Sequence, residues 1–193
     1  MTGLPLLRAE NLSAGWSRAA GPVIGPLSFS VQGGEILGIS GPNGTGKSTL
    51  LAAVSGAAQI FSGSIMLAPG ARLALQMQQV PELDGVPLTG EELLRLTGAP
   101  AAGLPPWLQS RLFERLDRLS GGQRQCLHLW ACLDAPGEVV LLDEPTNNLD
   151  PAGVAFLIMA LRQRAEQGAA IVLVSHDREF LVAVCTRIEE VGQ

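Results

Sequence analysis

Residues 41–49 of the chain read Gly41-Pro42-Asn43-Gly44-Thr45-Gly46-Lys47-Ser48-Thr49. Its glycines and turn-forming residues allow the backbone to form a concave nest whose N–H groups point inward at a polyphosphate. Lys47 would then place a positive charge beside the terminal phosphates, and the Ser48 hydroxyl would coordinate Mg²⁺. The pattern therefore predicts a phosphate-binding loop.

The segments on either side of this loop supply the context that it needs. Residues 35–40 are mostly apolar and predict a buried strand. Residues 50–54 predict a helix, whose N-terminus adds partial positive charge to the site. A chance match is the alternative interpretation of the loop alone, and the loop by itself does not say which kind of nucleotide-binding protein this is.

Length and composition limit the classes to which the protein can belong. The 193 residues suffice for one domain with a sizeable core, and the formal net charge is −5. An acidic chain without a basic stripe argues against duplex nucleic acid as the main partner. No apolar run approaches the ~18 residues that span a bilayer. The N-terminus does not read as a secretory signal, so the chain is expected to stay in the cytosol.

The cysteines predict packing rather than metal binding. Cys126, Cys132 and Cys185 are an odd number without the spacing of a metal site. Cys126 and His128 could suggest a ligand pair, but on a helix their side chains diverge by about 200°. Reduced, buried thiols are therefore expected.

Two further apolar runs end in polar residues. Residues 138–142 lead into Asp143 and Glu144, and residues 171–174 lead into Ser175-His176-Asp177. Runs that are apolar on both faces are typical of parallel strands, and ligands bind beyond the carboxyl ends of such strands. The two runs are expected to lie side by side, so their polar ends should meet at one site.

Other segments predict the rest of the secondary structure. Thr89 should cap a helix that contains Glu91 and Glu92, and apolar residues recur at helical spacing from Trp107 to Leu116. Residues 32–34 read as a hairpin-type turn, and residues 76–79 look too polar for a core strand. The remaining predicted strands cover residues 4–12, 27–31, 63–67, 72–75 and 187–191, and the remaining helices cover residues 120–133, 151–164 and 178–184.

Three signals occur in one order: the phosphate loop, then Leu119-Ser120-Gly121-Gly122-Gln123, then Asp143-Glu144. Together they resemble the nucleotide-binding cassette of the ABC ATPases over nearly the whole chain. The resemblance implies an α/β fold with a P-loop NTPase core of mostly parallel sheet flanked by helices, an N-terminal antiparallel β portion and a small helical subdomain. One ABC ATPase domain is expected over 1–193, with the core in 1–78 and 135–193 and the helical subdomain in about 79–134.

The resemblance assigns chemical roles to the strand-end residues. Asp143 would hold Mg²⁺ through water while Ser48 binds it directly, and Glu144 would act as the general base for the attacking water. His176 would be the switch histidine that contacts the γ-phosphate. The alternatives are a solvated strand-end carboxylate for Glu144 and a structural role for His176.

The serine–glycine stretch implies a second anion site at a helix N-terminus. The helical insertion separates it from the loop within one chain, so the resemblance implies a head-to-tail homodimer in which each copy closes on its partner's ATP. Asn147 to Asp150 would lie at that interface. The residues expected to contact ATP are Trp16, Gly41, Asn43, Gly44, Thr45, Gly46, Lys47, Ser48, Thr49, Ser120, Gly121, Gly122, Gln123 and Asp150.

Two assignments keep alternatives. Trp16 is either a core residue or the flat platform on which adenine stacks, a place where the family usually has tyrosine. Gln78 is the best candidate for the glutamine that contacts Mg²⁺, because its spacing to residues 87–96 resembles the zinc/manganese-type importers; Gln79 is the fallback and Gln76 the third choice. The helix after Gln123 departs from the family's usual arginine pattern, and the insertion is short, so coupling to a partner could be atypical.

The resemblance implies a function with ATP and Mg²⁺ as cofactors. The chain would be the ATP-hydrolysing subunit of a transporter, cytoplasmic and peripheral on the inner face of the membrane, docked on a separate integral membrane subunit without inserting into the bilayer itself. The alternative is a soluble, non-transport ABC ATPase that acts in translation or cluster assembly. A third possibility, an ATP-gated dimerisation module without turnover, is disfavoured by the presence of Glu144 and His176.

Overall fold

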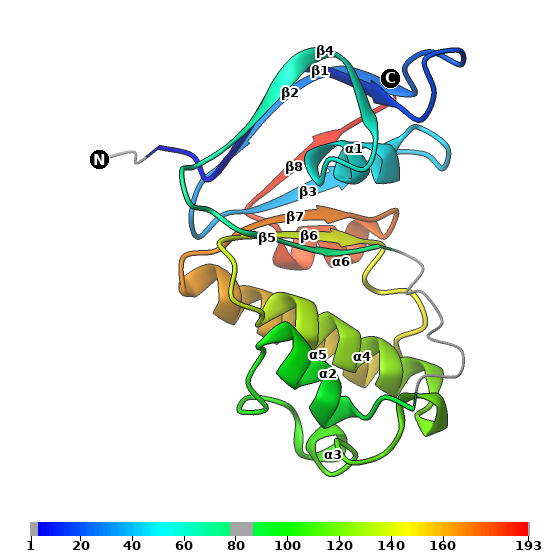
Figure 1. Cartoon of the computed structure of the whole chain (residues 1–193), viewed down its shortest axis with the longest axis vertical. Coiled ribbons are helices and arrows are strands. Elements are labelled where there is room, and N and C mark those ends of the chain that lie inside the picture. The colour runs from blue at the N-terminus through cyan, green and yellow to red at the C-terminus, as the bar shows by residue number, and fades with distance from the viewer. Residues whose placement is uncertain (1–3, 78–86, 193) are drawn as a thin grey trace.

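Two β-sheets and the helices around them build the fold (Figure 1). The computed structural model of the chain describes residues 4–77 and 87–192. One sheet is antiparallel with the order β2-β1-β4, formed by β1 (Leu7–Gly15), β2 (Ile24–Val31) and β4 (Gln59–Leu67). The other is parallel with the order β5-β6-β7-β3-β8, formed by β3 (Ile36–Ser40), β5 (Leu73–Gln76), β6 (Val139–Asp143), β7 (Ala170–Val174) and β8 (Arg187–Glu190). The predicted fold class is confirmed.

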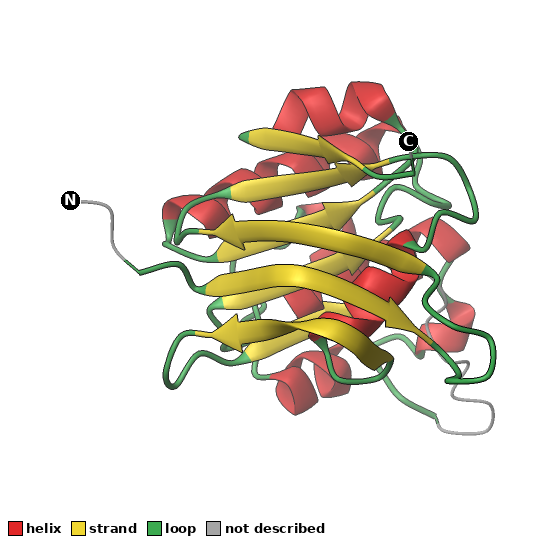
Figure 2. Cartoon of the chain, turned by 90° about the horizontal axis from the view of Figure 1, so that it is seen from above, coloured by secondary structure: helices red, strands yellow, loops and turns green. Residues whose placement is uncertain are grey.

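The helices lie in two layers. Helix α1 (Lys47–Val54) packs between the sheets, against β1, β2, β4 and β6. The other helices lie on the opposite side of the parallel sheet, as Figure 1 shows. They are α2 (Gly90–Thr97), α3 (Pro106–Gln109), the 3₁₀ turn η1 (Leu116–Arg118), α4 (Gly121–Leu133), α5 (Pro151–Glu166) and α6 (Arg178–Val184). Seen from above, the antiparallel sheet covers the parallel one (Figure 2).

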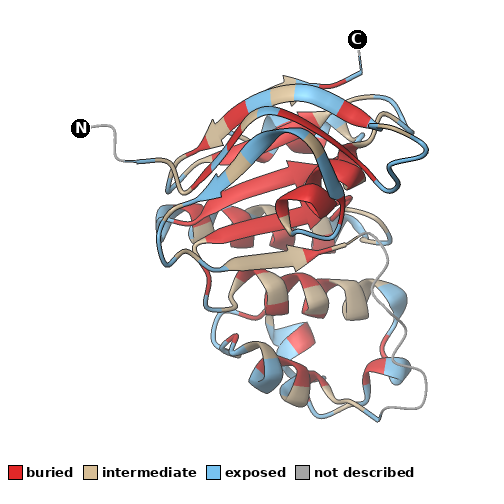
Figure 3. Ribbon diagram, turned by 45° about the horizontal axis from the view of Figure 1, so that its top comes forward, coloured by how far each residue is buried: buried red, intermediate tan, exposed pale blue. Residues whose placement is uncertain are grey.

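The buried strands divide their side chains between two cores, as expected for runs that are apolar on both faces. In β6, Val139 and Leu141 join the core around α1, whereas Val140 and Leu142 join the core beneath α4 and α5. Burial is concentrated in these strands (Figure 3). The position of the parallel sheet between two layers therefore follows from apolar side chains at successive residues.

Local signals set the ends of the helices. Thr89 and Glu92 form a reciprocal capping box at the start of α2: the Thr89 N–H donates to Glu92 Oε2 at 2.8 Å, and the Glu92 N–H donates to Thr89 Oγ1 at 3.3 Å. Gly98 ends this helix in the left-handed conformation at φ 75°. The predicted helix over this segment is confirmed.

One helix predicted from periodicity is wrong. Between Trp107 and Leu116 only the single turn α3 is helical, and it ends at Gln109. Yet Leu108, Leu112 and Leu116 are all buried. The helical spacing in the sequence records which residues face the core, and irregular turns place them there instead of a continuous helix.

Two details of the strands also differ from expectation. The turn at residues 32–34 exists, but it joins β2 to β3, which lie in different sheets, so it is not a hairpin. Gln76 is not outside the sheet: it is the last residue of β5, pairs with Leu142 of β6 and is only 7% exposed. Backbone pairing along β5 places this amide in the interior although its polarity argued against it.

The buried amide of Gln76 has a measurable cost. Neither its Oε1 nor its Nε2 has a hydrogen-bond partner within the parts of the chain that the structure describes. Replacing Gln76 by Leu should therefore raise the free energy of unfolding by about 1–2 kcal/mol, because a desolvated, unpaired amide is removed. Urea unfolding measures this difference.

The matched control is Gln59→Leu, since Gln59 is an exposed strand residue. Its effect should stay within roughly 0.5 kcal/mol. A Gln76→Leu protein that unfolds more easily than the wild type would contradict the prediction.

Candidate functional site

The phosphate loop connects β3 to α1 and is already folded as a nest. Gly44 and Gly46 adopt the left-handed conformation, at φ 82° and 88°. The ammonium group of Lys47 donates to the carbonyl oxygens of Gly41 and Pro42, each at 2.8 Å, and Lys47 is only 6% exposed. The loop therefore encloses the ammonium group of its own lysine.

Gly46 also lets another segment approach the loop. A Cβ atom at this residue would lie 2.8 Å from Ile24 Cβ and 3.0 Å from the Val23 carbonyl oxygen. The start of β2, in the antiparallel sheet, thus packs directly on the phosphate loop of the parallel sheet. Only a residue without a side chain permits this contact.

The second part of the site follows β6. Asp143 pairs with Val174 of β7, and the Glu144 N–H donates to the Val174 carbonyl at 2.8 Å. Glu144 has φ 48°, a left-handed conformation that costs a non-glycine residue energy and is concentrated at functional sites. The predicted neighbourhood of the two strand ends is confirmed.

Glu144 meets His176 at this edge. The Glu144 Oε2 atom lies 2.9 Å from His176 Nδ1, and it accepts from the Ser175 hydroxyl at 3.3 Å and from the His176 N–H at 3.4 Å. Three groups from the end of β7 therefore fix one carboxylate, which is 7% exposed. The imidazole is more open to solvent.

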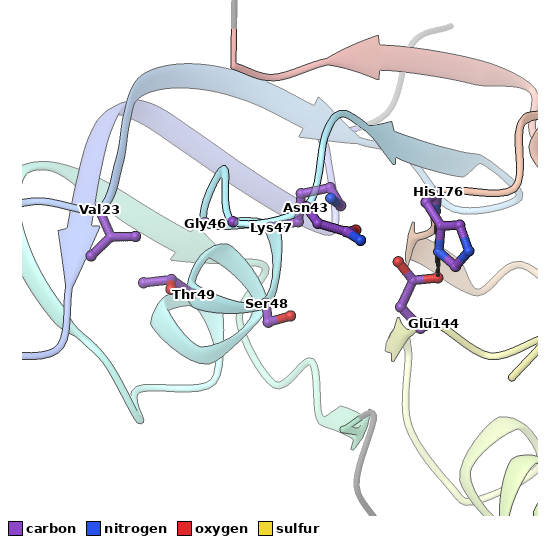
Figure 4. A pocket seen from close by; sticks show the side chains of 9 residues that line it. Val23, Asn43, Gly46, Lys47, Ser48, Thr49, Glu144 and His176 are labelled. Atoms are coloured by element: carbon purple, nitrogen blue, oxygen red, sulfur yellow. Dashed lines mark hydrogen bonds and ion pairs between the residues drawn. The ribbon is translucent and has the colours of Figure 1, made fainter.

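A pocket of about 400 Å³ joins these parts (Figure 4). Its volume is within the range of small-molecule sites. Figure 4 shows Val23 and Thr49 at one end, and Glu144 with His176 at the other. The residues that line it are Val23, Asn43, Gly44, Gly46, Lys47, Ser48, Thr49, Glu144 and His176.

Comparison with known proteins agrees with this geometry. The family profile described as "ABC transporter" matches residues 24–95, and one described as "AAA domain, putative AbiEii toxin, Type IV TA system" matches residues 100–183. The chain is 33% identical to the zinc import ATP-binding protein ZnuC of Jannaschia sp. (strain CCS1), over 96% of this chain and 78% of that protein. The chain belongs to the ATP-binding cassette family of ABC transporters.

Two further relatives place this cassette more broadly. It is 38% identical to the energy-dependent translational throttle protein EttA of Escherichia coli (strain K12), over 86% of this chain but only 31% of EttA. A solved structure described as "Structure of ATP binding subunit of ABC transporter" superposes with a TM-score of 0.82 at 26% identity, covering 96% of this chain and 85% of the other.

Not every residue expected to bind ATP lies in the pocket of this cassette. Gly41 and Thr45 belong to the loop but are not among the lining residues, and the Thr45 hydroxyl donates to the Pro42 carbonyl at 2.9 Å. Trp16 is joined to the pocket through Thr49, since its indole Nε1 donates to Thr49 Oγ1 at 3.1 Å. Val23 lines the pocket although sequence reasoning missed it, because only the tertiary approach to Gly46 brings it there.

The signature residues lie outside this pocket. Ser120 caps α4: its hydroxyl accepts from the Gln123 N–H at 3.2 Å, and the Gln123 side chain accepts from the Ser120 N–H at 3.1 Å. Asp150 caps α5 by accepting from the Gly153 N–H at 2.7 Å. A nucleotide-binding role for Ser120, Gly121, Gly122, Gln123 and Asp150 stays a prediction.

The donor set fits magnesium. Ser48 offers a hydroxyl in the pocket, and Asp143, 2% exposed, offers a carboxylate directly before Glu144. Hydroxyl and carboxylate oxygens are the hard ligands that Mg²⁺ prefers. Gln78, the third expected ligand, lies outside the described residues, as does its fallback Gln79.

The cysteines show the environment of packed thiols. Burial raises the pKa of Cys126 to about 11, with the nearby Asp150 charge adding to the shift. Burial likewise raises the pKa values of Cys132 and Cys185 to about 12. Cys126 is buried, and Cys132 and Cys185 are partly buried. Within the described residues no cluster of three or more His, Cys, Asp or Glu could hold a metal ion.

The two loop glycines provide a matched pair for a stability test. Gly46→Ala should lower the melting temperature by more than Gly44→Ala, because both residues need a positive φ but only Gly46 is crowded. The left-handed conformation alone costs alanine about 1–2 kcal/mol, and the clash with Ile24 and Val23 adds to this at Gly46. Thermal unfolding of both variants measures the difference.

Gly44→Ala serves as the control for backbone strain, since nothing lies within 4 Å of a Cβ atom there. Equal melting temperatures for the two variants would show that the contact between β2 and the loop contributes nothing.

Proposed function

We propose that this chain is the ATP-hydrolysing subunit of an ABC transporter and that two copies dimerise head to tail around two ATP molecules. The observation that carries the proposal is the placement of Glu144 and His176 across one pocket from Lys47 and Ser48. A cation with loop amides at one wall and a buried carboxylate at the other is the arrangement that phosphoryl transfer to water requires.

The geometry of the pocket favours one direction for the nucleotide. The phosphates would occupy the loop, where Lys47 exchanges the carbonyls of Gly41 and Pro42 for phosphate oxygens. The base would point to the end formed by Val23 and Thr49, and the γ-phosphate to the end formed by Glu144 and His176. Every pocket residue then has one place along the nucleotide.

Glu144 is suited to the role of general base. A carboxylate that is buried and held by three hydrogen-bond donors keeps one orientation, so it can align a water molecule and accept its proton. His176, joined to the same oxygen, would keep the carboxylate aligned and reach the γ-phosphate with the rest of its ring. Mg²⁺ bound by Ser48, Asp143 and Gln78 would neutralise charge on the phosphates.

A second copy is needed to complete the site. Of the described residues around the pocket, none belongs to the stretch from Ser120 to Gln123, although this stretch forms the N-terminus of α4, where Ser120 and Gly121 are exposed. Such an N-terminus attracts a phosphate. A head-to-tail partner would bring its own Ser120 over the open side of the pocket, and ATP would join the two copies.

The membrane partner follows from the kinship with transporter subunits. Among the described residues, none of the helices could span a membrane. The chain would lie at the cytoplasmic face and drive a separate integral membrane subunit. Because the chain is similar to a zinc import protein, a metal ion is the first cargo to test. Action in translation is the second candidate, favoured by the 38% identity with EttA.

Copurification separates these two functions. An integral membrane protein bound to the tagged chain supports transport, whereas ribosomes in the same fraction support a role in translation.

Replacing Glu144 by Gln should leave ATP binding intact and lower the hydrolysis rate by about 10²–10⁴-fold, because the amide cannot accept the proton of the attacking water. Phosphate release and equilibrium binding of ATP measure the two quantities. The control is Glu179→Gln, a change of an exposed carboxylate in the first turn of α6. Unchanged hydrolysis in the Glu144→Gln protein would exclude this residue as the base.

Two inactive variants should restore activity when mixed if the dimer is head to tail. Lys47→Ala removes the loop cation and Ser120→Arg blocks the signature, so neither homodimer has an intact site. Half of randomly paired dimers are mixed and each contains one intact site, which predicts about a quarter of the wild-type hydrolysis rate. No activity in the mixture, with both variants folded by circular dichroism, would contradict this arrangement.

A further inference from the structure

One hydrogen bond links the base end of the pocket to the phosphate loop. Trp16 follows directly after β1, and its indole Nε1 donates to the hydroxyl of Thr49 in the first turn of α1, at 3.1 Å. Trp16 follows a strand of the antiparallel sheet, whereas Thr49 lies in the helix that follows β3 of the parallel sheet. The two residues are 33 positions apart in the chain. A contact of this kind orients one part of the site relative to another.

The two partners differ in mobility. Thr49 is 4% exposed and lies in a helix, so the packing around it restricts the position of its hydroxyl. Trp16 is 55% exposed, so packing restricts its ring less than it restricts Thr49. The hydrogen bond therefore anchors an exposed aromatic ring to a buried residue of α1.

A second contact fixes the same wall. Val23 lines the pocket beside Thr49, and its backbone approaches the loop at Gly46, where a Cβ atom would lie 3.0 Å from the Val23 carbonyl oxygen. The Val23 N–H donates to the Ala14 carbonyl near the end of β1 at 2.7 Å. The segment between β1 and β2 is thus attached to the loop at Thr49 and at Gly46.

We propose that Thr49 is a positioning residue for the nucleotide base: its hydroxyl holds the Trp16 indole in place before a purine ring stacks on it. This inference rests on the proposed function, because it assumes that the pocket takes a purine nucleoside triphosphate. The hydroxyl accepts the indole hydrogen and can still donate its own hydrogen to a phosphate oxygen. One side chain would then hold the ring beneath the base and also contact a neighbouring phosphate.

Two ligands can separate the two actions of the Thr49 side chain, which are to orient the Trp16 ring and to contact a phosphate. ATP has a base and inorganic triphosphate has none, so only ATP benefits from an oriented ring. Ordering a mobile side chain on binding weakens affinity, and the loss of the hydrogen bond should lower the affinity for ATP by about five-fold more than that for inorganic triphosphate. The variant is Thr49→Val, which keeps the branched shape and removes the hydroxyl.

The matched control is Thr49→Ser, which keeps the hydroxyl and should keep the ratio of the two affinities near the wild-type value. A second background, Trp16→Phe, keeps an aromatic ring but has no indole N–H. In that background Thr49→Val should change the ratio of the two affinities no further, because there is no hydrogen bond left to remove. Isothermal titration calorimetry gives all affinities.

Fluorescence adds a readout without nucleotide. The emission of Trp16 is the difference between wild-type and Trp16→Phe proteins, and its anisotropy should fall in Thr49→Val but not in Thr49→Ser as the ring gains motion.

The outcomes distinguish the two proposals. If Thr49→Val weakens ATP and inorganic triphosphate equally, or leaves the Trp16 anisotropy unchanged, the positioning role is wrong while the nucleotide site stands. If the wild-type chain binds neither ligand, the proposed function fails and the positioning role fails with it.

Discussion

The parallel register of β7 with its two neighbours is the constraint on which the site depends. Val174 is the partner of both Ile39 in β3 and Asp143 in β6, so three strands end at the same level of the sheet. The phosphate loop follows the end of β3, Glu144 follows Asp143 at the end of β6, and the Ser175–His176 pair follows the end of β7. A shift of one residue in either pairing would separate the loop cation from the carboxylate and turn buried side chains to the wrong core.

The antiparallel sheet contributes one lining residue of the pocket, Val23 directly before β2, and its attachment is local. The two sheets share one apolar core around α1, but apolar packing alone does not fix how one sheet lies on the other to within a fraction of an ångström. The contact of Gly46 with Val23 and Ile24, together with the hydrogen bond from Trp16 to Thr49, supplies that registration. The loop thus positions a neighbouring wall through its glycine, beside the phosphates that we propose it binds.

Much of this could be predicted from the sequence because the decisive patterns are local. The apolar runs before Ser40, Asp143 and Ser175 gave β3, β6 and β7, and their polar ends gave Glu144 and His176. The segments that were missed or wrongly predicted depend on tertiary contacts. Residues of β4 are exposed on both faces and show no alternation, so only the last half of this strand was expected.

The misses share that physical cause. Leu108, Leu112 and Leu116 face the core at helical spacing without forming a helix, because burial and backbone conformation are separate properties. Gln76 is buried because its strand continues, whatever its polarity. Val23 carries no signal of its own, since its place in the pocket comes from the absence of a side chain at Gly46.

The resting state of Lys47 has a consequence for how the loop receives an anion. With its ammonium group shielded from solvent and donating to two carbonyl oxygens, this lysine has already lost most of its hydration shell when the protein folds. An arriving triphosphate therefore displaces neutral peptide dipoles, not bulk water, from the cation. Most of the dehydration of this charge therefore takes place when the protein folds, and not when the ligand binds.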